Sequence, residues 1–251
     1  MMKKFLFIFM ACAMLLTACG TNADAPISRE DVLNDTAEEQ MESERKLIAL
    51  TFDDGPNTTT MVEVLDLLEE YNAVATFFLI GNYINDDTAP VLNRALEMGC
   101  ELGNHTWSHG YTSKLDAEGI KEEIESVQRK VYEVTGIIPE YFRPPYFDMN
   151  QTMYDVIDLP FIGGFSSQDW DSSVSAEERV KLFFEGYGED KIAVLHCFKG
   201  NSNTVEALKT ILPRLVDEGY EFVTVSELFE EYGLTPEAHN GVLYASADDV
   251  K

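Results

Sequence analysis

Two histidines lie four residues apart in the segment 105–109 (HTWSH), directly after a short run that predicts a β-strand. If this segment forms one helical turn, both imidazoles point to the same side and can bind one metal ion. A third histidine, His196, ends another predicted strand, and the chain has only four histidines. One histidine alone is compatible with an ordinary structural role. The spacing of His105 and His109 favours a metal site.

Two adjacent carboxylates, Asp53 and Asp54, follow an apolar run and precede Gly55 and Pro56, a turn-forming pair. Adjacent carboxylates repel each other unless a cation or a proton relieves the repulsion. A metal ion bound by one of them, with the other free to accept a proton, would use both. The motif alone fits an aspartate-rich surface turn equally well.

Short β-rich runs alternate with longer amphipathic runs from Leu47 onward, a pattern typical of parallel strands joined by helices. The expected strands are Leu47–Phe52, Ala75–Ile80, Cys100–Asn104, Glu140–Arg143, Phe161–Phe165, Ile192–His196 and Glu221–Val225. The expected helices are Met61–Tyr71, Ala89–Met98, Ile120–Val134, Gln151–Ile157, Glu177–Gly186 and Val205–Glu218. We therefore expect an α/β fold, a distorted seven-stranded (β/α) barrel of the TIM-barrel type, formed by a single catalytic domain.

The residues that could do chemistry share one position in this scheme, the carboxyl ends of strands. Closed parallel barrels hold their reactive groups at this rim. The polar residues found there are Asp53, Asp54, His105, Arg143, Asp169 and His196. Residues far apart in the chain should therefore meet at one site.

The N-terminal segment has the layout of an export signal, because Lys3 and Lys4 precede the apolar run 5–16. That run is too short to span a bilayer. It leads into residues 16–20 (LTACG), which resemble the lipobox of bacterial lipoproteins, whose cysteine receives lipid. We expect residues 1–18 to be a lipoprotein signal peptide and Cys19 to anchor an extracytoplasmic protein to the cell membrane. A plain signal peptide is the alternative.

The composition constrains the rest of the chain. Residues 19–46 are acidic, which predicts a solvated tether; residues 47–233 are the expected domain, and residues 234–251 are expected to be a polar, frayed tail. The formal charge of −27 disfavours nucleic acid as a partner and is otherwise compatible with a solvated acidic surface. Cys100 and Cys197 lie in apolar runs and predict buried thiols rather than a disulfide. We expect a monomer.

Three motifs together resemble a known family. The segments 51–56 (TFDDGP), 105–109 (HTWSH) and 143–146 (RPPY) look like the first three motifs of the polysaccharide deacetylases of the NodB-homology type, carbohydrate esterase family 4. They occur in the family's order and at the expected strand ends. The resemblance covers roughly Leu47 to Tyr232.

The resemblance implies a metal site with an adjacent base. Asp54, His105 and His109 would hold the metal ion, while Asp53 would be the catalytic base and Arg143 would orient it. Two neutral imidazoles and one carboxylate leave positions open for water and a substrate oxygen, as in a catalytic rather than a structural site. Such ligands suit zinc first, but also cobalt, nickel, manganese or iron.

The resemblance also implies a general acid and a substrate pocket. His196 would be the acid, supported by Asp169. Trp170 and Val194 would line the pocket for the acetyl methyl group, and Tyr146 would offer its backbone N–H to the oxyanion.

Four positions depart from the family pattern. Phe147 stands where a glycine usually follows the RPPY segment, and Ser166 stands where an aspartate is frequent. Val194 replaces a leucine, and Cys197 replaces an aspartate after the histidine. None of these changes removes a predicted metal ligand or the base.

The expected function is removal of N-acetyl groups from amino sugars of peptidoglycan or chitin-like oligomers, with release of acetate. Removal of O-acetyl groups from xylan is the second hypothesis, because the same site can attack esters. A catalytically silent carbohydrate-binding protein is the alternative from another class, and the retained site residues argue against it.

Overall fold

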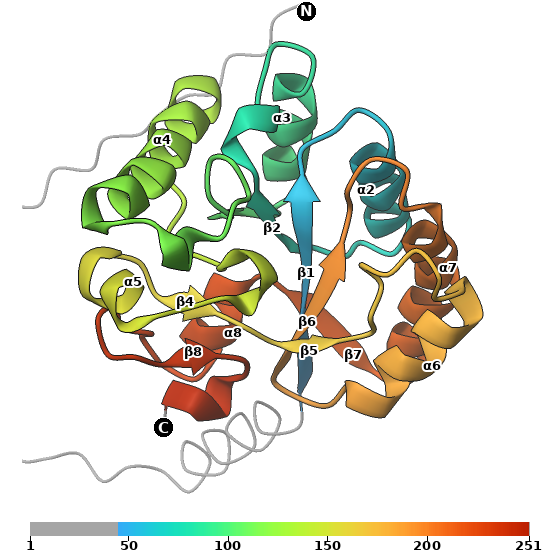
Figure 1. Ribbon diagram of the computed structural model, residues 1–251. Coiled ribbons are helices and arrows are strands. Elements are labelled where there is room, and N and C mark those ends of the chain that lie inside the picture. Colours follow the sequence, from blue (N-terminus) through green and yellow to red (C-terminus); the bar gives the residue numbers. More distant parts are fainter. Residues whose placement is uncertain (1–44, 251) are drawn as a thin grey trace, which may run out of the picture. The chain divides into compact units, whose positions relative to one another are not determined.

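Strand β1 (Lys46–Gly55) occupies the centre of a parallel sheet, as Figure 1 shows for the computed structural model of the chain. The structure describes residues 45–250. Residues 47–52 are completely buried, which explains why the strand is continuously apolar apart from one threonine rather than alternating. Its last residues carry the two adjacent aspartates to the carboxyl edge of the sheet.

Most of the remaining elements alternate as the sequence predicts, whereas helix α8 and strand β8 were not predicted. The other strands are β2 (Thr76–Leu79), β3 (Glu101–Asn104), β4 (Phe161–Ile162), β5 (Phe165–Ser166), β6 (Lys191–His196), β7 (Tyr220–Val223) and β8 (Leu243–Tyr244). The α-helices are α2 (Thr60–Glu70), α3 (Ala89–Glu97), α4 (Ala117–Thr135), α5 (Gln151–Val156), α6 (Ala176–Gly186), α7 (Ser202–Asp217) and α8 (Val225–Glu231). Short 3₁₀ turns are η1 (Gly81–Tyr83), η2 (Thr112–Lys114), η3 (Pro145–Phe147) and η4 (Ala247–Val250).

The main sheet has the order β3-β2-β1-β6-β5, and every pair is parallel. Beyond β3, Phe142 bridges to Asn104 on one side and to Phe161 of β4 on the other. These contacts connect the two ends of the sheet through the segment 161–166. The expected distorted (β/α) barrel is confirmed.

Three predicted strands differ in detail. The run Glu140–Arg143 contributes only an isolated bridge at Phe142, and Phe161–Phe165 is divided into β4 and β5. Gly164 causes the division: its φ is 151°, and a Cβ there would lie 2.3 Å from the carbonyl oxygen of Ile192. The seventh predicted strand, β7, pairs with residues 46–49 of β1 and with no other strand of residues 45–250.

Helices pack around the sheet and complete the core (Figure 1). Helix α4 begins three residues before the predicted Ile120, because Asp116 caps it by accepting a hydrogen bond from the N–H of Gly119, and Gly136 ends it in the left-handed conformation. Helices α6 and α7 pack against each other beside β5 and β6. The core between helices and sheet includes the stacked rings of Phe52 and Phe77.

The C-terminal segment is part of the domain, so the expectation of a frayed tail from residue 234 was wrong. Strand β8 pairs in parallel with β4, and Tyr244 is 3% exposed. The Tyr244 ring packs against Phe229 of α8. Polar composition misled the prediction because a few buried apolar side chains are enough to hold this segment.

The predicted signal peptide, the lipid anchor at Cys19 and most of the tether lie outside the described residues. Within residues 45–250, no helix has the length and apolar character needed to cross a membrane. Cys100 and Cys197 are buried free thiols, as expected.

Candidate active site

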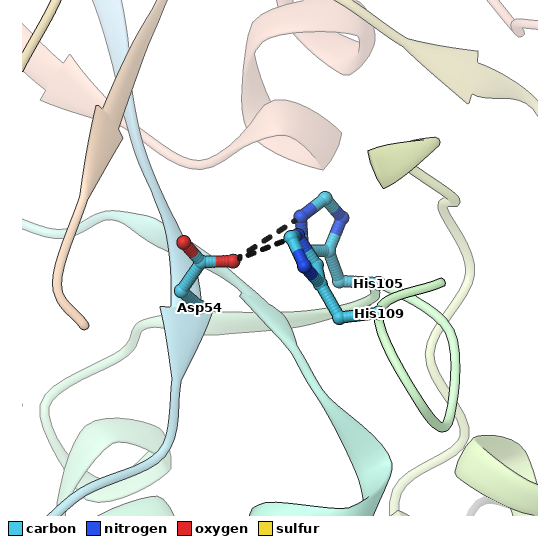
Figure 2. A group of neighbouring side chains, drawn as sticks. All are labelled: Asp54, His105 and His109. Atoms are coloured by element: carbon cyan, nitrogen blue, oxygen red, sulfur yellow. Dashed lines mark ion pairs between the residues drawn. The ribbon is translucent and has the colours of Figure 1, made fainter. Parts of the chain in front are cut away.

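The predicted metal ligands Asp54, His105 and His109 converge from two different segments (Figure 2). The Oδ1 atom of Asp54 lies 3.1 Å from Nε2 of His109 and 3.5 Å from Nε2 of His105. Among the described residues, this buried oxygen accepts no well-formed hydrogen bond. The structure thus brings these three side chains together.

The backbone conformation that brings the two histidines together differs from the predicted helical turn. Residues 105–109 form an irregular loop after β3 and not a helical turn. Thr106 and His109 both have positive φ, 67° and 57°. The loop is held by its own hydrogen bonds: Asn104 Oδ1 accepts from the N–H of Thr106 at 3.0 Å, and Thr106 Oγ1 accepts from the N–H of His109 at 3.0 Å.

The tautomer of His105 follows from its second ring nitrogen. Nδ1 lies 2.7 Å from the backbone carbonyl oxygen of Arg143, which can only accept a hydrogen bond, so Nδ1 carries the proton. In the neutral ring, Nε2 then presents its lone pair toward Asp54. A carboxylate oxygen facing such a lone pair is repelled unless a cation lies between them. The chemistry of these donors therefore fits a metal ion.

Asp53 and Asp54 both line the same cleft although they are consecutive residues of a strand. Successive side chains of a regular strand point to opposite faces. Here the pairing of β1 with β2 shifts register between Asp53 and Gly55, and Asp54 has a φ of 69°. This β-bulge turns the second carboxylate toward the first.

The charge of Asp54 depends on its histidine neighbours. Burial raises the pKa of Asp54, but His105 and His109, through the Nε2–H groups and positive charge that their rings have when protonated, outweigh burial and hold this pKa well below its usual range. Asp54 is therefore a carboxylate at neutral pH.

Asp53 is paired with a completely buried arginine. The Nη1 atom of Arg143 donates to Oδ1 of Asp53 at 2.7 Å and to Oγ1 of Thr51 at 2.6 Å. The other guanidinium nitrogens donate to the carbonyl oxygens of Ile162 and Gly163, both at 3.0 Å. Burial lowers the pKa of Arg143, and Asp53 opposes that effect. The predicted pair is present and its geometry is fixed from four sides.

His196 and Asp169 form a second buried pair at the end of β6. Oδ1 of Asp169 lies 2.8 Å from Nδ1 of His196, and Oδ2 accepts from the backbone N–H of His196 at 2.7 Å. Burial alone would lower the pKa of His196, but Asp169, with smaller contributions from Asp53 and Asp54, raises it to about 9. The ring is therefore protonated at neutral pH, with Nε2 free to donate a proton.

A cleft of about 530 Å³ is lined by the predicted metal ligands, by Asp53 and His196, and by the predicted substrate-contacting residues. Val194 is buried in its wall, while Tyr146 and Trp170 are each 58% exposed at its rim. The cleft is lined by Asp53, Asp54, His105, His109, Pro144, Tyr146, Phe147, Ser166, Trp170, Val194, His196 and Phe198.

Two residues near the site were not predicted. Phe198 lines the cleft, and the ring of Tyr111 stacks on Tyr146 with centroids 4.7 Å apart. Each lies two residues after a histidine of the predicted site, and this position in the sequence could have indicated that it is near the site. A second cavity of about 620 Å³ shares Asp54 and Phe198 with the cleft and extends toward Asn82 and Tyr83.

The departures from the family pattern have structural consequences. Phe147 has a φ of 52°, the left-handed region that favours glycine. Cys197 is buried, and its N–H and Sγ lie 2.9 Å and 3.4 Å from the carbonyl oxygen of Asp53. It therefore supports the backbone of the predicted base.

Comparison with known proteins identifies the class. The family model described as Polysaccharide deacetylase matches residues 40–159. The chain is 48% identical over 192 residues to a bifunctional xylanase/deacetylase of Pseudobutyrivibrio xylanivorans, covering 76% of this chain and 32% of that protein. It is 36% identical over 200 residues to a peptidoglycan-N-acetylglucosamine deacetylase of Bacillus cereus, covering 75% of this chain and 91% of that protein. The chain belongs to the polysaccharide deacetylase family.

A solved structure supports the same assignment. The family 4 acetyl xylan esterase from Clostridium thermocellum, in complex with a cobalt ion, is 37% identical and superposes with a TM-score of 0.77. The match covers 80% of this chain and 98% of that one. By contrast, the chain spans about a third of the length of the xylanase/deacetylase, so the match covers one domain of a larger relative.

Proposed function

We propose that this chain is a metal-dependent hydrolase that removes N-acetyl groups from amino sugars of a polysaccharide and releases acetate. The observation that carries the proposal is the convergence of Asp54, His105 and His109 in a cleft that is also lined by one member of each of two proton-carrying pairs. Those pairs are Asp53 with Arg143 and His196 with Asp169.

Asp54, His105 and His109 would hold the metal ion. Their fit rests on the buried Oδ1 of Asp54, which lacks a well-formed hydrogen bond within the described residues, and on the lone pair that His105 directs toward it. A bound divalent cation would polarise the acetyl carbonyl and make water a better nucleophile. Zinc is our first candidate and cobalt the second, since the C. thermocellum relative was solved with cobalt.

Asp53 would accept the proton of the attacking water. Its hydrogen bond to the buried Arg143 guanidinium, at 2.7 Å, keeps the carboxylate oriented. Because Oδ1 is engaged by Arg143, Oδ2 is the oxygen available for the proton.

His196 would protonate the departing amine on the other side of the scissile bond. Asp169 fixes the proton on Nδ1 and raises the pKa of the ring, against the lowering effect of burial, so that Nε2 is also protonated. The N–H of Tyr146 would bind the oxyanion, and Trp170 and Val194 would enclose the acetyl methyl group.

The groove is suited to a chain of sugars rather than to a single small ester. The cleft adjoins the second cavity, because Asp54 and Phe198 line both. Exposed rings at the rim, Tyr83, Tyr146 and Trp170, are side chains on which sugar faces can pack.

Xylan O-acetyl groups are the second candidate substrate. The relative at 48% identity and the esterase at 37% both carry xylan activity in their names, whereas the B. cereus relative at 36% acts on peptidoglycan by its name. The catalytic residues serve an ester as well as an amide.

Acetate release from acetylated chitooligosaccharide, peptidoglycan and acetylxylan, measured side by side, tests the proposal. We expect the protein to release acetate from an N-acetylated polymer. Chelation of the metal should abolish this release, and addition of zinc or cobalt should restore it. Activity on acetylxylan alone would replace the first substrate with the second. Full activity of the metal-free protein would refute the mechanism.

Variants separate catalysis from carbohydrate binding. His196→Ala should retain the metal, measured by elemental analysis, and keep only a low residual turnover, while His105→Ala should lose both the metal and turnover. If Asp53→Asn and His105→Ala left the effect on wall polymer unchanged, the chain would be a silent binding protein.

We also propose that the chain acts outside the cytoplasm, attached to the membrane through lipid at Cys19. The basic start, the apolar run 5–16 and the residues 16–20 support this location. Fractionation of cells that express the full chain tests it: the native protein should be membrane-associated and Cys19→Ser should not. Equal membrane association of both would contradict lipid anchoring at this cysteine.

A further inference from the structure

A second completely buried arginine lies behind the general-acid side of the site. Arg179 of α6 is 1% exposed. Its guanidinium donates four hydrogen bonds, all to uncharged oxygens: the carbonyls of Asp171 and Val174, Oδ1 of Asn201 and Oγ1 of Thr204. Burial of a cation is costly unless charge and hydrogen bonds compensate it.

Thr204 connects this guanidinium to Asp169. Nη1 of Arg179 donates to Oγ1 of Thr204 at 2.9 Å, and the same hydroxyl donates to Oδ2 of Asp169 at 2.8 Å. Arginine can only donate and an ionised carboxylate can only accept, so the direction of the hydroxyl proton is fixed. The chain of hydrogen bonds ends at His196, whose Nδ1 lies 2.8 Å from the other oxygen of Asp169.

Asn201 forms a parallel connection through the backbone. Its Oδ1 accepts from Nη1 of Arg179 at 2.6 Å. Its Nδ2 donates to the carbonyl oxygens of His196 at 2.9 Å and Asp169 at 3.2 Å. One buried side chain therefore holds the loops that carry both members of the acid pair.

We propose that Arg179, acting through Thr204 and Asn201, is a positioning residue that orients Asp169 and thereby keeps the Nε2–H of His196 directed into the cleft. The inference rests on the proposed hydrolytic function, because it concerns the acid of that reaction. The proposed role of Arg179 resembles that of Arg143 on the side of the catalytic base, where Arg143 bonds to Asp53 directly. On the acid side, a neutral hydroxyl separates the arginine from the carboxylate, so the imidazole remains the only cation that pairs directly with Asp169 among the described residues.

The central variant is Thr204→Val, which removes the hydroxyl with little change in volume. Loss of one hydrogen bond to a charged group should lower kcat about 10-fold and change KM less than about 2-fold. Thr204→Ser keeps the hydroxyl and should restore most of kcat. Thr210→Val is the matched control, because Thr210 is exposed on the same helix.

A double-mutant cycle distinguishes positioning of the acid from simple support of the fold. In a His196→Ala background, Thr204→Val should change kcat less than about 2-fold, because the group through which it acts is gone. Similar 10-fold losses in both backgrounds would overturn the inference and leave a structural role for Thr204. Arg179→Lys should lower kcat by a similar factor to Thr204→Val, because an ammonium group lacks the planar guanidinium geometry that bonds two oxygens at once.

Proton NMR gives a readout that does not depend on activity. The Nδ1–H proton of His196 should appear as a downfield imidazole resonance that is absent from His196→Ala. We expect Thr204→Val to shift or broaden this resonance and Thr204→Ser to retain it. An unchanged resonance in Thr204→Val would overturn the inference. Absence of acetate release by the wild-type protein would instead refute the proposed function, and the two failures are therefore distinguishable.

Discussion

Replacement of Arg143 by methionine would leave the carboxylate of Asp53 buried without its partner. Arg143 is completely buried and Asp53 is 2% exposed. The 2.7 Å hydrogen bond between them is the contact that compensates both charges. Methionine fills much of the same volume, so the main change is loss of the charge and of its hydrogen bonds.

The expected destabilisation follows from these contacts. Removing one member of a buried ion pair costs about 3–5 kcal/mol, because the remaining charge stays unpaired. The carbonyl oxygens of Ile162 and Gly163 lose their donors in addition. For a domain of this size, the loss corresponds to a fall of roughly 10–15 °C in the thermal midpoint.

Urea denaturation in the presence of a chelator measures this effect without a contribution from metal binding. The double variant Asp53→Asn, Arg143→Met tests its cause, since the uncompensated charge is then absent. We expect the double variant to recover about 2 kcal/mol or more of the loss in the single variant. Equal or greater destabilisation of the double variant would show that the unpaired carboxylate is not the reason.

Three further changes test other parts of the structure. Asp169→Asn removes the main charge that, against burial, raises the pKa of His196 to about 9. Because His196 must be protonated to act as the acid, the decrease of kcat/KM at alkaline pH should move to lower pH in this variant. If the decrease does not move, the titration of His196 is not its cause. Gly164→Ala should lower the free energy of unfolding, measured by urea denaturation, by more than about 3 kcal/mol, because the new Cβ would meet the backbone of Ile192. Gly136→Ala has nothing within 4 Å of its new Cβ and should lower it by about 1–2 kcal/mol, so similar losses in the two variants would contradict the steric reason. Tyr244→Ala should cost about 3 kcal/mol if the C-terminal segment is part of the core, and a loss below about 1 kcal/mol would contradict that packing.

The position of the site could be predicted because it depends on topology. The sequence indicates parallel strands, and the carboxyl ends of such strands meet at one rim. Asp53, His105 and His196 lie at the ends of β1, β3 and β6, which the alternating pattern located. No knowledge of side-chain directions was needed for this step.

The local geometry of the site could not be predicted because it departs from the regular periodicities. The side-by-side position of Asp53 and Asp54 requires a bulge, and the position of His109 requires left-handed residues in its loop. A period of 2 or 3.6 residues contains no information about such conformations. Positive φ values at residues other than glycine recur around this cleft, at Tyr146 and Phe147 among others, and strained backbone is often concentrated at functional sites.

The three acidic side chains of the site differ in what balances their charge, and this difference supports the division of roles. Asp53 is bonded to Arg143, and Asp169 is bonded to His196. Within residues 45–250, the ion-pair partners of Asp54 are His105 and His109. Because the backbone carbonyl of Arg143 fixes the proton of His105 on Nδ1, a neutral His105 offers Asp54 a lone pair and no positive charge. A divalent cation would supply a counter-charge to Asp54 when the histidines are neutral, and this supports the proposal that Asp54 binds the metal while Asp53 transfers the proton.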